Sequence, residues 1–428
     1  MKQRVLILGG GFGGAYCAQA LERAARDIDV ETLLIDRNNY FVFHPLLVEA
    51  GTGSLHPRDA VVSIRSFLRS TRFRMAEVLG VDLERRQVTC RTVGSDVPEA
   101  IDWDHLVLAL GSVTRLPEVP GLREYGYELK GLSDAVALRD HAITMLEAAD
   151  ATADHERRRS FLHFVVVGGN FTGAEVAGEF HQFLRNASRR YPGLRPGDCR
   201  VTLIEIADRI LGAVEPDLSE YATRSMRRRG IDVRLQTSVV AIERDTVRLS
   251  TGEALPASTV IWCAGIAPSP LVRKISVPVD ERGYILCERD LSVRGFDRVW
   301  AIGDCAVNPG PDGVPYPATA QHAVREGVHL ARSLARVLSG RAALPFEYAS
   351  RGAVAALGCR TGVARVLGVK LSGFPAWFLW RTVYLLKMPG LARKARVALD
   401  WTADLFFPRD YVQLGVHRSE PKDHHRGV

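Results

Sequence analysis

Cysteines are few in this chain, and no two of them form a close pair. The chain has 428 residues, of which 7 are cysteine, and none shows the C-x-x-C spacing. This pattern argues against a zinc site and against a disulfide framework, and it indicates a reduced compartment. The sequence also lacks any uncharged apolar run of about 18 residues, so we expect no membrane-spanning helix. The apolar run after Met1–Arg4 is too short for a signal peptide, and we expect the protein to stay in the cytosol.

Acidic residues are absent from residues 351–399, where nine basic residues occur. The whole chain has 56 Lys and Arg against 49 Asp and Glu, a net charge of +7, so the remainder has 47 basic residues against 49 acidic ones. The positive charge is therefore a local property of the C-terminal region. It indicates an anionic partner for that region and says nothing special about the rest of the chain.

A strand, a glycine-rich turn and a helix are predicted near the N-terminus. An apolar run over 5–8 leads into the turn, and a helix-compatible stretch follows over 15–26. The glycines that match G-x-G-x-x-G are Gly9, Gly11 and Gly14. They allow a tight turn, the approach of a pyrophosphate and close packing of helix on strand, with the pyrophosphate at the helix N-terminus. A second strand over 31–35 ends in Asp36, whose carboxylate can accept hydrogen bonds from ribose hydroxyls.

The same pattern occurs again over 164–184. Asn170 occupies the middle glycine position of this second turn. Asparagine tolerates a left-handed backbone better than most residues, but we expect its side chain to intrude where the pyrophosphate approaches. We favour a nucleotide site here over a repeat that has kept its fold and lost its ligand. A later strand over 201–204 ends in Glu205, which would favour NADH over NADPH by repelling a 2′-phosphate; the alternative is a solvated acid at a strand end.

Two nucleotide-binding patterns in one chain predict an α/β protein with two Rossmann-like dinucleotide-binding domains. One such site normally holds a flavin and the other a nicotinamide, so we expect FAD and NADH. Two further apolar strands end in small residues at Gly111 and Gly265, as expected where the chain crosses between domains. Another strand ends in Gly303-Asp304, where Asp304 could bond a ribityl hydroxyl. The predicted parts are 1–115 and 266–345 for FAD, 116–265 for NADH, inserted in the FAD domain, and 346–428 at the C-terminus.

This order of motifs resembles the two-dinucleotide flavoprotein oxidoreductases of glutathione-reductase-like topology. Three local segments resemble the type II NADH dehydrogenases, single-subunit NADH:quinone oxidoreductases of the membrane surface: Phe-His-Pro-Leu-Leu over 43–47, Thr-Gly-Ala-Glu over 172–175 and Thr-Ala-Gln-His-Ala-Val-Arg-Glu-Gly over 319–327. The resemblance implies hydride transfer from NADH to FAD and then electron transfer to a membrane quinone, without proton pumping.

The resemblance also implies roles for individual residues. Gln321 would contact the flavin or the quinone, and Glu175 would shape the nicotinamide site or relay protons; the alternatives are a polar helix start and a helix-dipole partner. Family members often have a second Gln near Arg325-Glu326, which this chain lacks. FAD would be held non-covalently by Gly11, Phe12, Gly13, Asp36, Gly111, Asp304 and Gln321, and NADH by Gly169, Asn170, Thr172 and Glu205. Gly9, Gly14, Val78, Gly168 and Gly265 complete the predicted cofactor-binding set, which includes no metal ligand.

Other functions of the same architecture stay open. They are a sulfide:quinone oxidoreductase, a reductase of a soluble acceptor, and a flavin-bearing redox sensor. A dithiol reductase would need a close cysteine pair near the flavin, and none lies between Cys17 and Cys90. Sulfide:quinone oxidoreductases use cysteines of the second nucleotide region and of the C-terminal region. Cys359 alone fits this pattern, and no cysteine lies between Cys90 and Cys199.

The C-terminal region shows an amphipathic pattern. Apolar residues three or four apart predict a helix, with Arg381 and Lys387 away from its most apolar line. The stripe consists of Trp377, Trp380, Tyr384, Met388 and Leu391, and a second helix carries Val397, Trp401 and Leu405. Aromatic and basic side chains favour an anionic lipid surface, so we expect 374–407 to lie on the cytoplasmic face of the cell membrane. The alternatives are a homodimer interface or a core helix pair, and nucleic-acid binding is not expected. We expect a disordered tail over 418–428.

Overall fold

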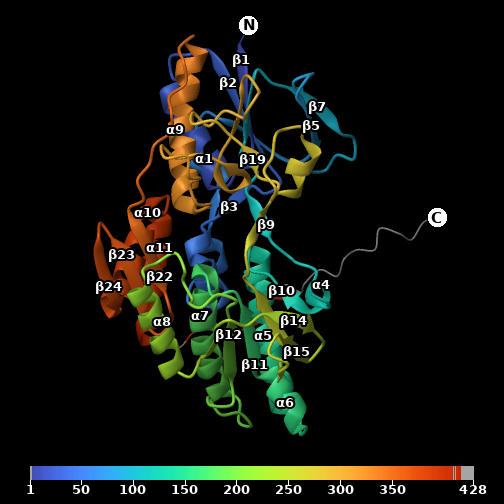
Figure 1. The fold of residues 1–428 in the computed structure, drawn as a ribbon, viewed down its shortest axis with the longest axis vertical. Helices are drawn as coiled ribbons and strands as arrows, with labels where there is room; N and C mark the ends of the chain where they lie inside the picture. The colour runs from blue at the N-terminus through green and yellow to red at the C-terminus, as the bar shows by residue number, and fades with distance from the viewer. Residues whose placement is uncertain (1, 408, 410, 416–428) are drawn as a thin grey trace, which may run out of the picture. The chain divides into compact units, whose positions relative to one another are not determined.

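Figure 1 shows the fold as a computed structural model, which describes residues 2–407, 409 and 411–415. The chain forms two compact units, each of which is described by itself. Unit 1 contains residues 1–42, 61–113 and 266–350, and unit 2 contains residues 43–60, 114–265 and 351–428. The tail predicted over 418–428 lies outside the described residues.

Unit 1 is built on a seven-stranded sheet in the order β20-β8-β1-β2-β5-β6-β7, parallel from β20 to β5 and antiparallel beyond. The strands are β1 (Gln3–Leu8), β2 (Val30–Asp36), β5 (Arg72–Asp82), β6 (Gln87–Thr92), β7 (Glu99–Asp102), β8 (His105–Leu108) and β20 (Val299–Ala301). In β1, Val5 and Ile7 contribute to the core on one face and Leu6 and Leu8 to the core on the other. A central parallel strand is apolar throughout because both of its faces are covered.

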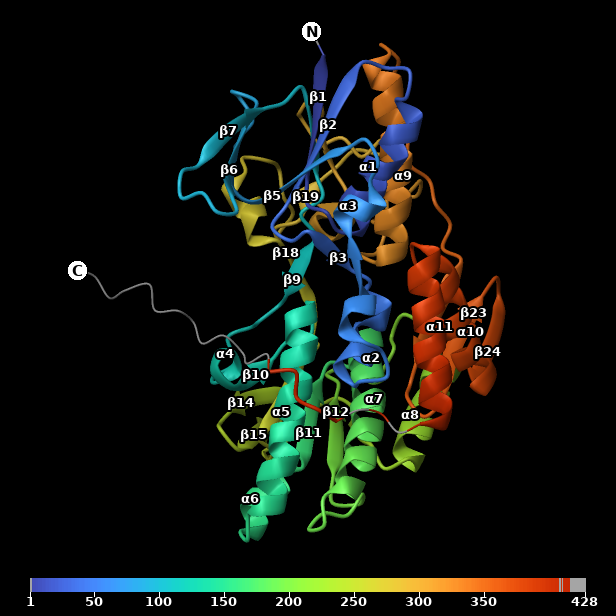
Figure 2. The same cartoon turned by 180° about the vertical axis from the view of Figure 1, so that it is seen from behind.

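Two helices of unit 1 lie side by side on one face of this sheet. Figures 1 and 2 show α1 (Phe12–Ala24) in blue beside α9 (Ala320–Leu338) in orange. They can pack closely because Gly327 of α9 has no side chain where it meets the backbone of Gly13 in α1. The remaining short elements of unit 1 are β3 (Tyr40–Val42), β4 (Val61–Ser63), α3 (Ile64–Phe67), β9 (Ser112–Thr114), β18 (Ile266–Pro268), β19 (Ile285–Leu286) and β21 (Ala306–Val307).

Unit 2 contains a five-stranded parallel sheet in the order β10-β17-β11-β12-β13. Its strands are β10 (Gly126–Tyr127), β11 (His163–Val167), β12 (Arg200–Ile204), β13 (Asp232–Arg234) and β17 (Thr259–Trp262), with β14 (Val239–Ile242), β15 (Thr246–Leu249) and β16 (Ala254–Pro256) in a second, antiparallel sheet. Its helices are α2 (Leu47–Gly51), α4 (Leu122–Tyr125), α5 (Leu132–Ala151), α6 (His155–Phe161), α7 (Phe171–Ala187) and α8 (Pro216–Arg228). The short helix α2 packs against both α5 and α7.

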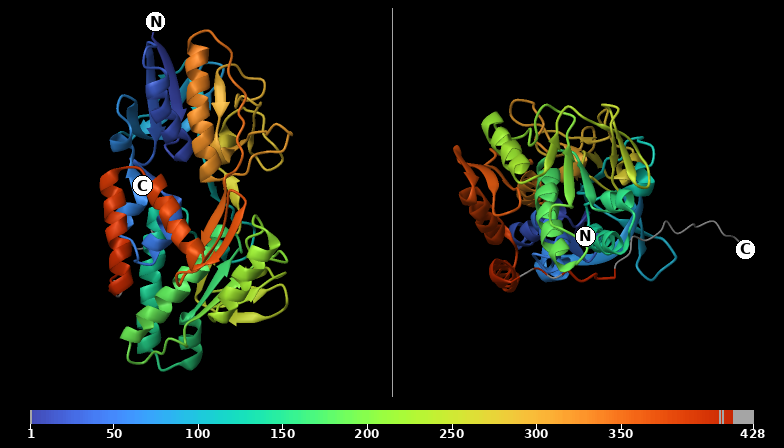
Figure 3. Two further views of the ribbon diagram at one scale, coloured as in Figure 1. Left: turned by 90° about the vertical axis from the view of Figure 1, so that its left-hand side faces the viewer. Right: turned by 90° about the horizontal axis from the view of Figure 1, so that it is seen from below.

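The C-terminal region belongs to unit 2. It forms an antiparallel sheet and two helices, drawn in orange to red in Figure 3. The elements are β22 (Gly352–Ala356), β23 (Gly362–Val366), β24 (Val369–Gly373), α10 (Phe374–Lys387) and α11 (Leu391–Phe406). Strand β22 packs against α7, and β23 packs against α8. Among the described residues, no helix has the length and apolar character needed to cross a membrane.

The predicted α/β class with two Rossmann-like units is confirmed. The chain crosses between the units at 113/114, 265/266 and 350/351, where the sequence predicted 115/116, 265/266 and 345/346. It also crosses at 42/43 and 60/61, which the sequence did not indicate. The segment 43–60 therefore leaves unit 1 and packs in unit 2.

The orientation predicted for the tryptophan stripe is wrong. Trp377, Trp380, Met388, Val397 and Trp401 are all buried, so this face of α10 and α11 packs inward. Eight apolar side chains of this region are exposed instead: Phe374, Phe378, Leu386, Leu391, Leu399, Leu405, Phe406 and Phe407. Leu391 and Leu405 belong to the predicted stripes, so these stripes are buried only in part. The basic side chain of Arg381 points inward as well, with its guanidinium 4.3 Å from the ring centre of Trp377 and 4.7 Å from that of Trp401.

Candidate functional site

The first glycine turn has the geometry that a pyrophosphate requires. Gly9 has φ +101°, a conformation that L side chains rarely adopt, and its N–H donates to the carbonyl of Ile35 (2.8 Å). A Cβ on Gly14 would collide with the carbonyl oxygen of Gly9, so only glycine lets α1 approach the end of β1 this closely. A Cβ built on Gly11 meets no atom within 4 Å. The backbone is therefore open beside the middle glycine, at the N-terminus of α1.

Asp36 lies at the end of β2 and is tied to this turn. Its Oδ2 accepts a hydrogen bond from the Gly10 N–H (2.6 Å), and its Oδ1 accepts one from the Asn38 N–H (2.7 Å). Burial raises the pKa of Asp36 above its usual range, and the two N–H donors act in the opposite direction. Each carboxylate oxygen keeps a second lone pair, so Asp36 can also accept ribose hydroxyls. The residues present thus fit the adenosine and pyrophosphate parts of FAD.

Asp304 lies where the last parallel strand of unit 1 ends. The Ser112 hydroxyl donates to its Oδ2 (2.9 Å), which joins this turn to the segment after β8. The Gly303 N–H donates to the Glu326 carboxylate (2.6 Å), and burial raises the pKa of Glu326 to about 7. Sequence reasoning did not select Glu326 as a site residue, although it lies within the segment 319–327 that carries the family resemblance. Glu326 holds the turn that presents Asp304.

The structure places the other predicted residues of unit 1 near these turns or in the core. Gln321 lies in the first turn of α9, where its side-chain amide donates to the Ser350 hydroxyl (3.1 Å). Phe12 begins α1, and its ring packs 5.8 Å from that of Phe41. Val78 lies in β5 at a shift of register with β6. Gly111 has φ +64°, and a Cβ there would meet no atom within 4 Å.

The second glycine turn has the same design in unit 2. Gly168 has φ +104°, and its N–H donates to the carbonyl of Ile204 (2.8 Å). Asn170 has φ −73°, so its backbone is extended and does not need the left-handed conformation that asparagine tolerates. Its side chain caps α7 by accepting from the Gly173 N–H (3.0 Å) and donates to the carbonyl of Cys263 (2.6 Å). Both ends of the Asn170 side chain are therefore engaged by the protein.

Glu205 accepts a backbone hydrogen bond from the second glycine turn, as Asp36 does from the first. Its carboxylate accepts hydrogen bonds from the Gly169 N–H (2.5 Å) and the Ala207 N–H (2.8 Å). It is therefore a structural part of the turn and not a freely solvated acid. The Thr172 side chain is exposed, and the Gly265 carbonyl accepts from the Arg115 N–H (3.2 Å). The residues fit a dinucleotide with two free ribose hydroxyls.

Glu175 lies in the first turns of α7 and is bonded to the C-terminal region. Its Oε1 accepts hydrogen bonds from the Ala356 N–H (3.2 Å) and from the Trp380 indole (3.1 Å). Burial raises the pKa of Glu175 to about 8. An interaction with the helix dipole alone does not account for these two partners. At neutral pH the carboxyl group is mainly protonated.

A network of charged side chains that sequence reasoning missed surrounds this region of unit 2. The Trp401 indole donates to Glu49 (2.6 Å), which is 5% exposed and whose pKa burial raises to about 7. Arg381 lies between Glu49 (3.7 Å) and Asp404 (3.8 Å). No motif signals these contacts, because Glu49 and Trp401 are 352 positions apart.

A second arginine extends this network. Arg409 pairs with Asp404 (2.9 Å) and with Glu179 of α7 (3.1 Å). Its side chain is only 6% exposed. The network therefore ties α7, α2 and the C-terminal helices together through buried charges.

Six of the seven cysteines, all of which lie in the described part of the chain, are buried, and Cys359 is exposed. Burial raises the pKa of both the Cys263 and the Cys305 thiol to about 12. Thiols in such surroundings are poor nucleophiles. This arrangement does not favour a mechanism that needs two reactive cysteines.

Comparisons with known proteins agree with this geometry. The family model described as pyridine nucleotide-disulphide oxidoreductase matches residues 3–327, and the NDH2 C-terminal domain matches residues 350–410. The chain is similar to the demethylphylloquinone reductase NdbB of Synechocystis, with 32% identity over 94% of this chain and 96% of that protein. It is also similar to the type II NADH:quinone oxidoreductase of Staphylococcus haemolyticus, with 31% identity over 92% of this chain and 98% of that protein.

Among solved structures, NDH2 from Plasmodium falciparum in complex with NADH has a TM-score of 0.89 at 20% identity, covering 96% of this chain and 100% of that chain. This likeness shows the fold. The family of the chain is shown by the matching family models and by the two relatives. The chain belongs to the pyridine nucleotide-disulphide oxidoreductases and, within them, to the type II NADH:quinone oxidoreductases, flavoproteins that pass electrons from NADH to a quinone.

Proposed function

We propose that this protein performs the reaction of its family with the residues described above. The observation that carries the proposal is the presence of two glycine turns, each closed by a strand-end carboxylate: Asp36 on Gly10 and Glu205 on Gly169. Two such turns in one chain provide one site for a flavin dinucleotide and one for a nicotinamide dinucleotide. FAD, when bound, supplies the redox chemistry: it accepts hydride from NADH and passes electrons to the quinone.

The chain's own residues bind and orient the two dinucleotides. The open backbone beside Gly11 accepts the pyrophosphate of FAD at the α1 N-terminus, and Asp36 and Asp304 accept hydroxyl groups of its ribose and ribityl parts. The corresponding turn beside Gly169 accepts NADH. Glu205 prefers a free 2′-hydroxyl, because a 2′-phosphate would lie against its negative charge.

Gln321 and Glu175 are the proposed catalytic residues. Gln321 contacts the flavin or the quinone from the first turn of α9, where Ser350 fixes its amide. Glu175 is protonated at neutral pH because its pKa is about 8, so it can hold a proton near its Oε1 while Trp380 and Ala356 orient it. We expect Gln321→Ala to raise KM for a short-chain quinone while NADH still reduces the flavin.

The exposed apolar surface of α10 and α11 is the proposed membrane contact. Phe378 is 59% exposed and Leu386 is 69% exposed, and Lys387 and Lys394 supply positive charge nearby. Apolar side chains enter the headgroup boundary and lysines attract anionic lipid. We place this contact on the cytoplasmic face of the cell membrane, where NADH is available, and it brings the enzyme to its lipid-borne acceptor.

The assay that tests the reaction uses the purified, FAD-containing protein. NADH should bleach the flavin absorbance, and a short-chain quinone should restore it. A flavin band that NADH does not bleach would overturn the proposal. Bleaching without reoxidation by quinone would favour a reductase of another acceptor, and bleaching by sulfide in place of NADH would favour a sulfide oxidiser.

The membrane contact is tested with phosphatidylglycerol vesicles. Phe378→Glu should weaken vesicle binding about tenfold or more, because burying one phenylalanine contributes ~1.5–3 kcal/mol and a negative charge is repelled by this lipid. The matched control is Val93→Glu, which places the same charge at a side chain that is 65% exposed in unit 1. Equal binding of the two variants would contradict the proposal. A loss of dimers by Phe378→Glu with unchanged vesicle binding would assign the surface to a homodimer.

A further inference from the structure

A pocket lies in unit 2 at the end of the parallel sheet where strands β11, β12 and β13 begin. Its volume is about 520 Å³, within the range of pockets that bind small molecules, ~300–1,000 Å³. His163 and Arg200, the first residues of β11 and β12, line it, whereas Gly168 and Glu205 follow the opposite ends of the same two strands. The pocket is therefore separate from the nucleotide turn. Nothing in the proposed reaction uses it.

The charges of the pocket do not cancel. Arg234 is paired with Asp232 (2.7 Å) and with Glu253 (2.8 Å), so both acids of the lining are occupied by one arginine. Arg159 is exposed, and its ion pair with Glu156 is 3.4 Å long. Within the described part of the chain, Arg200 has no ion pair, and its guanidinium carries five N–H donors. The Arg200 guanidinium is thus available to a ligand, and Arg159 can join it by exchanging its solvent-exposed pair with Glu156.

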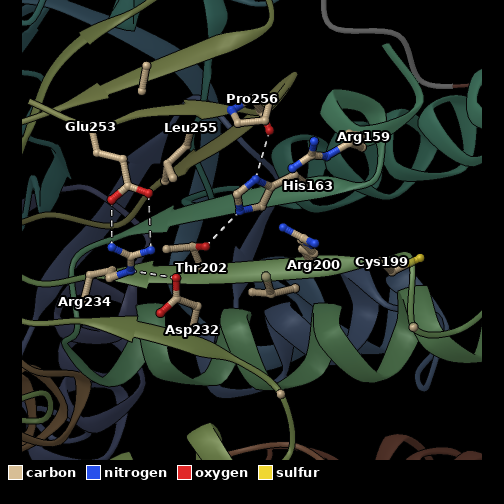
Figure 4. Close-up of a pocket in the computed structure, with 14 residues that line it drawn as sticks. Arg159, His163, Cys199, Arg200, Thr202, Asp232, Arg234, Glu253, Leu255 and Pro256 are labelled. Atoms are coloured by element: carbon tan, nitrogen blue, oxygen red, sulfur yellow. Dashed lines mark hydrogen bonds and ion pairs between the residues drawn. The ribbon is translucent and has the colours of Figure 1, made fainter. Parts of the chain in front are cut away.

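The polar groups of the wall are already satisfied. His163 Nδ1 donates to the carbonyl of Pro256 (2.9 Å), and its Nε2 accepts from the Thr202 hydroxyl (2.8 Å). Burial together with the positive charge of Arg200 lowers the pKa of His163, which favours the neutral imidazole. Leu255 and Pro256 add apolar surface. In Figure 4, Arg159 and Arg200 extend toward the same part of the pocket as the His163 ring.

We propose that this pocket binds a small organic anion, with its carboxylate or phosphate groups held by Arg200 and Arg159 and its carbon skeleton against Leu255 and Pro256. Guanidinium groups recognise both carboxylate and phosphate through paired N–H donors. The neutral His163 and the Arg234 cluster define the walls. Arg234 offsets one of the two carboxylate charges, and with Arg159 and Arg200 the charged groups of the lining sum to +1. The site lies outside both dinucleotide sites.

The experiment is titration calorimetry on the intact FAD-containing protein with two probes, citrate and inorganic phosphate. We expect at least one probe to bind, and the tighter one identifies the anionic group that the site prefers. Arg200→Gln should weaken that binding about tenfold or more, as expected for loss of a charge-assisted hydrogen bond. Arg200→Lys should retain part of the affinity, because the charge remains and the paired donors do not.

The control variant is Arg224→Gln. Arg224 lies on α8 of the same unit, outside the pocket, and is 64% exposed in an i,i+4 pair with Glu220. The Arg224→Gln substitution removes the same charge outside the pocket. The affinity of this variant for the probe should therefore equal that of the unaltered protein. Absence of binding by both probes, equal losses in Arg200→Gln and Arg224→Gln, or displacement of the probe by NADH would each overturn the proposal. Saturating NADH that leaves probe binding unchanged supports a separate site.

Discussion

Glu49→Gln tests whether a buried carboxyl group of unit 2 makes the fold sensitive to pH. Burial raises the pKa of Glu49 from 4.5 to about 7 in the folded protein. Between these two values the folded state binds a proton that the unfolded state has released, so the free energy of unfolding falls as pH rises. The slope is about 1.4 kcal/mol per pH unit, which over ~2.5 units amounts to about 3 kcal/mol. Glutamine cannot ionise, so the variant should lose this slope.

The assay is thermal unfolding of both proteins from pH 5 to pH 8. The melting temperature of Glu49→Gln, relative to the original protein, should rise by about 3 °C over this range, because the unfolding entropy of a chain of 428 residues is roughly 0.9 kcal/mol per kelvin. The matched control is Glu243→Gln, the same chemical change at a side chain that is 50% exposed and paired with Arg248. Its pH profile should run parallel to that of the original protein. A parallel profile for Glu49→Gln too would refute the reasoning.

Three further predictions concern individual contacts. Gly9→Ala should yield protein with little bound flavin, measured as flavin absorbance per polypeptide, because the new Cβ would collide with the Ala109 carbonyl at a φ of +101°. Glu205→Gln should raise kcat/KM for NADPH about tenfold relative to NADH, the effect of ~1.4 kcal/mol. Trp401→Phe leaves an oxygen of the buried Glu49 without its indole donor, and it should lower the free energy of unfolding in urea by ~1–3 kcal/mol.

The two nucleotide units could be predicted from sequence because their signals are local. The turn after β1 and the turn after β11 each need glycine within a few residues of an apolar strand, and a carboxylate follows at the end of the next strand. Such spacings are set by the geometry of a βαβ unit. The partners of Asn170 could not be predicted, because the sequence shows which residue occupies a position and not where its side chain points. The cap on Gly173 and the bond to Cys263 became apparent only with the fold.

The charged network around Glu49 could not be predicted for a different reason. Its members come from α2, α7 and the C-terminal helices, and the pairs are up to 352 positions apart. The sequence around Glu49 does not indicate that its carboxylate will contact the Trp401 indole and the Arg381 guanidinium. Burying a charge is costly unless it is paired, so contacts of this kind are decided by the complete tertiary arrangement.

For the tryptophan stripe of α10, the sequence predicted the helix correctly but not the environment of its tryptophans. Spacings of three and four predict a helix with one apolar face, and α10 is a helix that buries this face but also exposes Phe374, Phe378 and Leu386. Periodicity does not say whether that face meets lipid or protein, and aromatic rings suit either. In this protein the indole N–H groups of Trp380 and Trp401 donate to Glu175 and Glu49, so both rings are held within the protein. The buried part of the stripe therefore connects the C-terminal helices to α7 and α2, and the side chains left for lipid are the exposed apolar ones of the same helices.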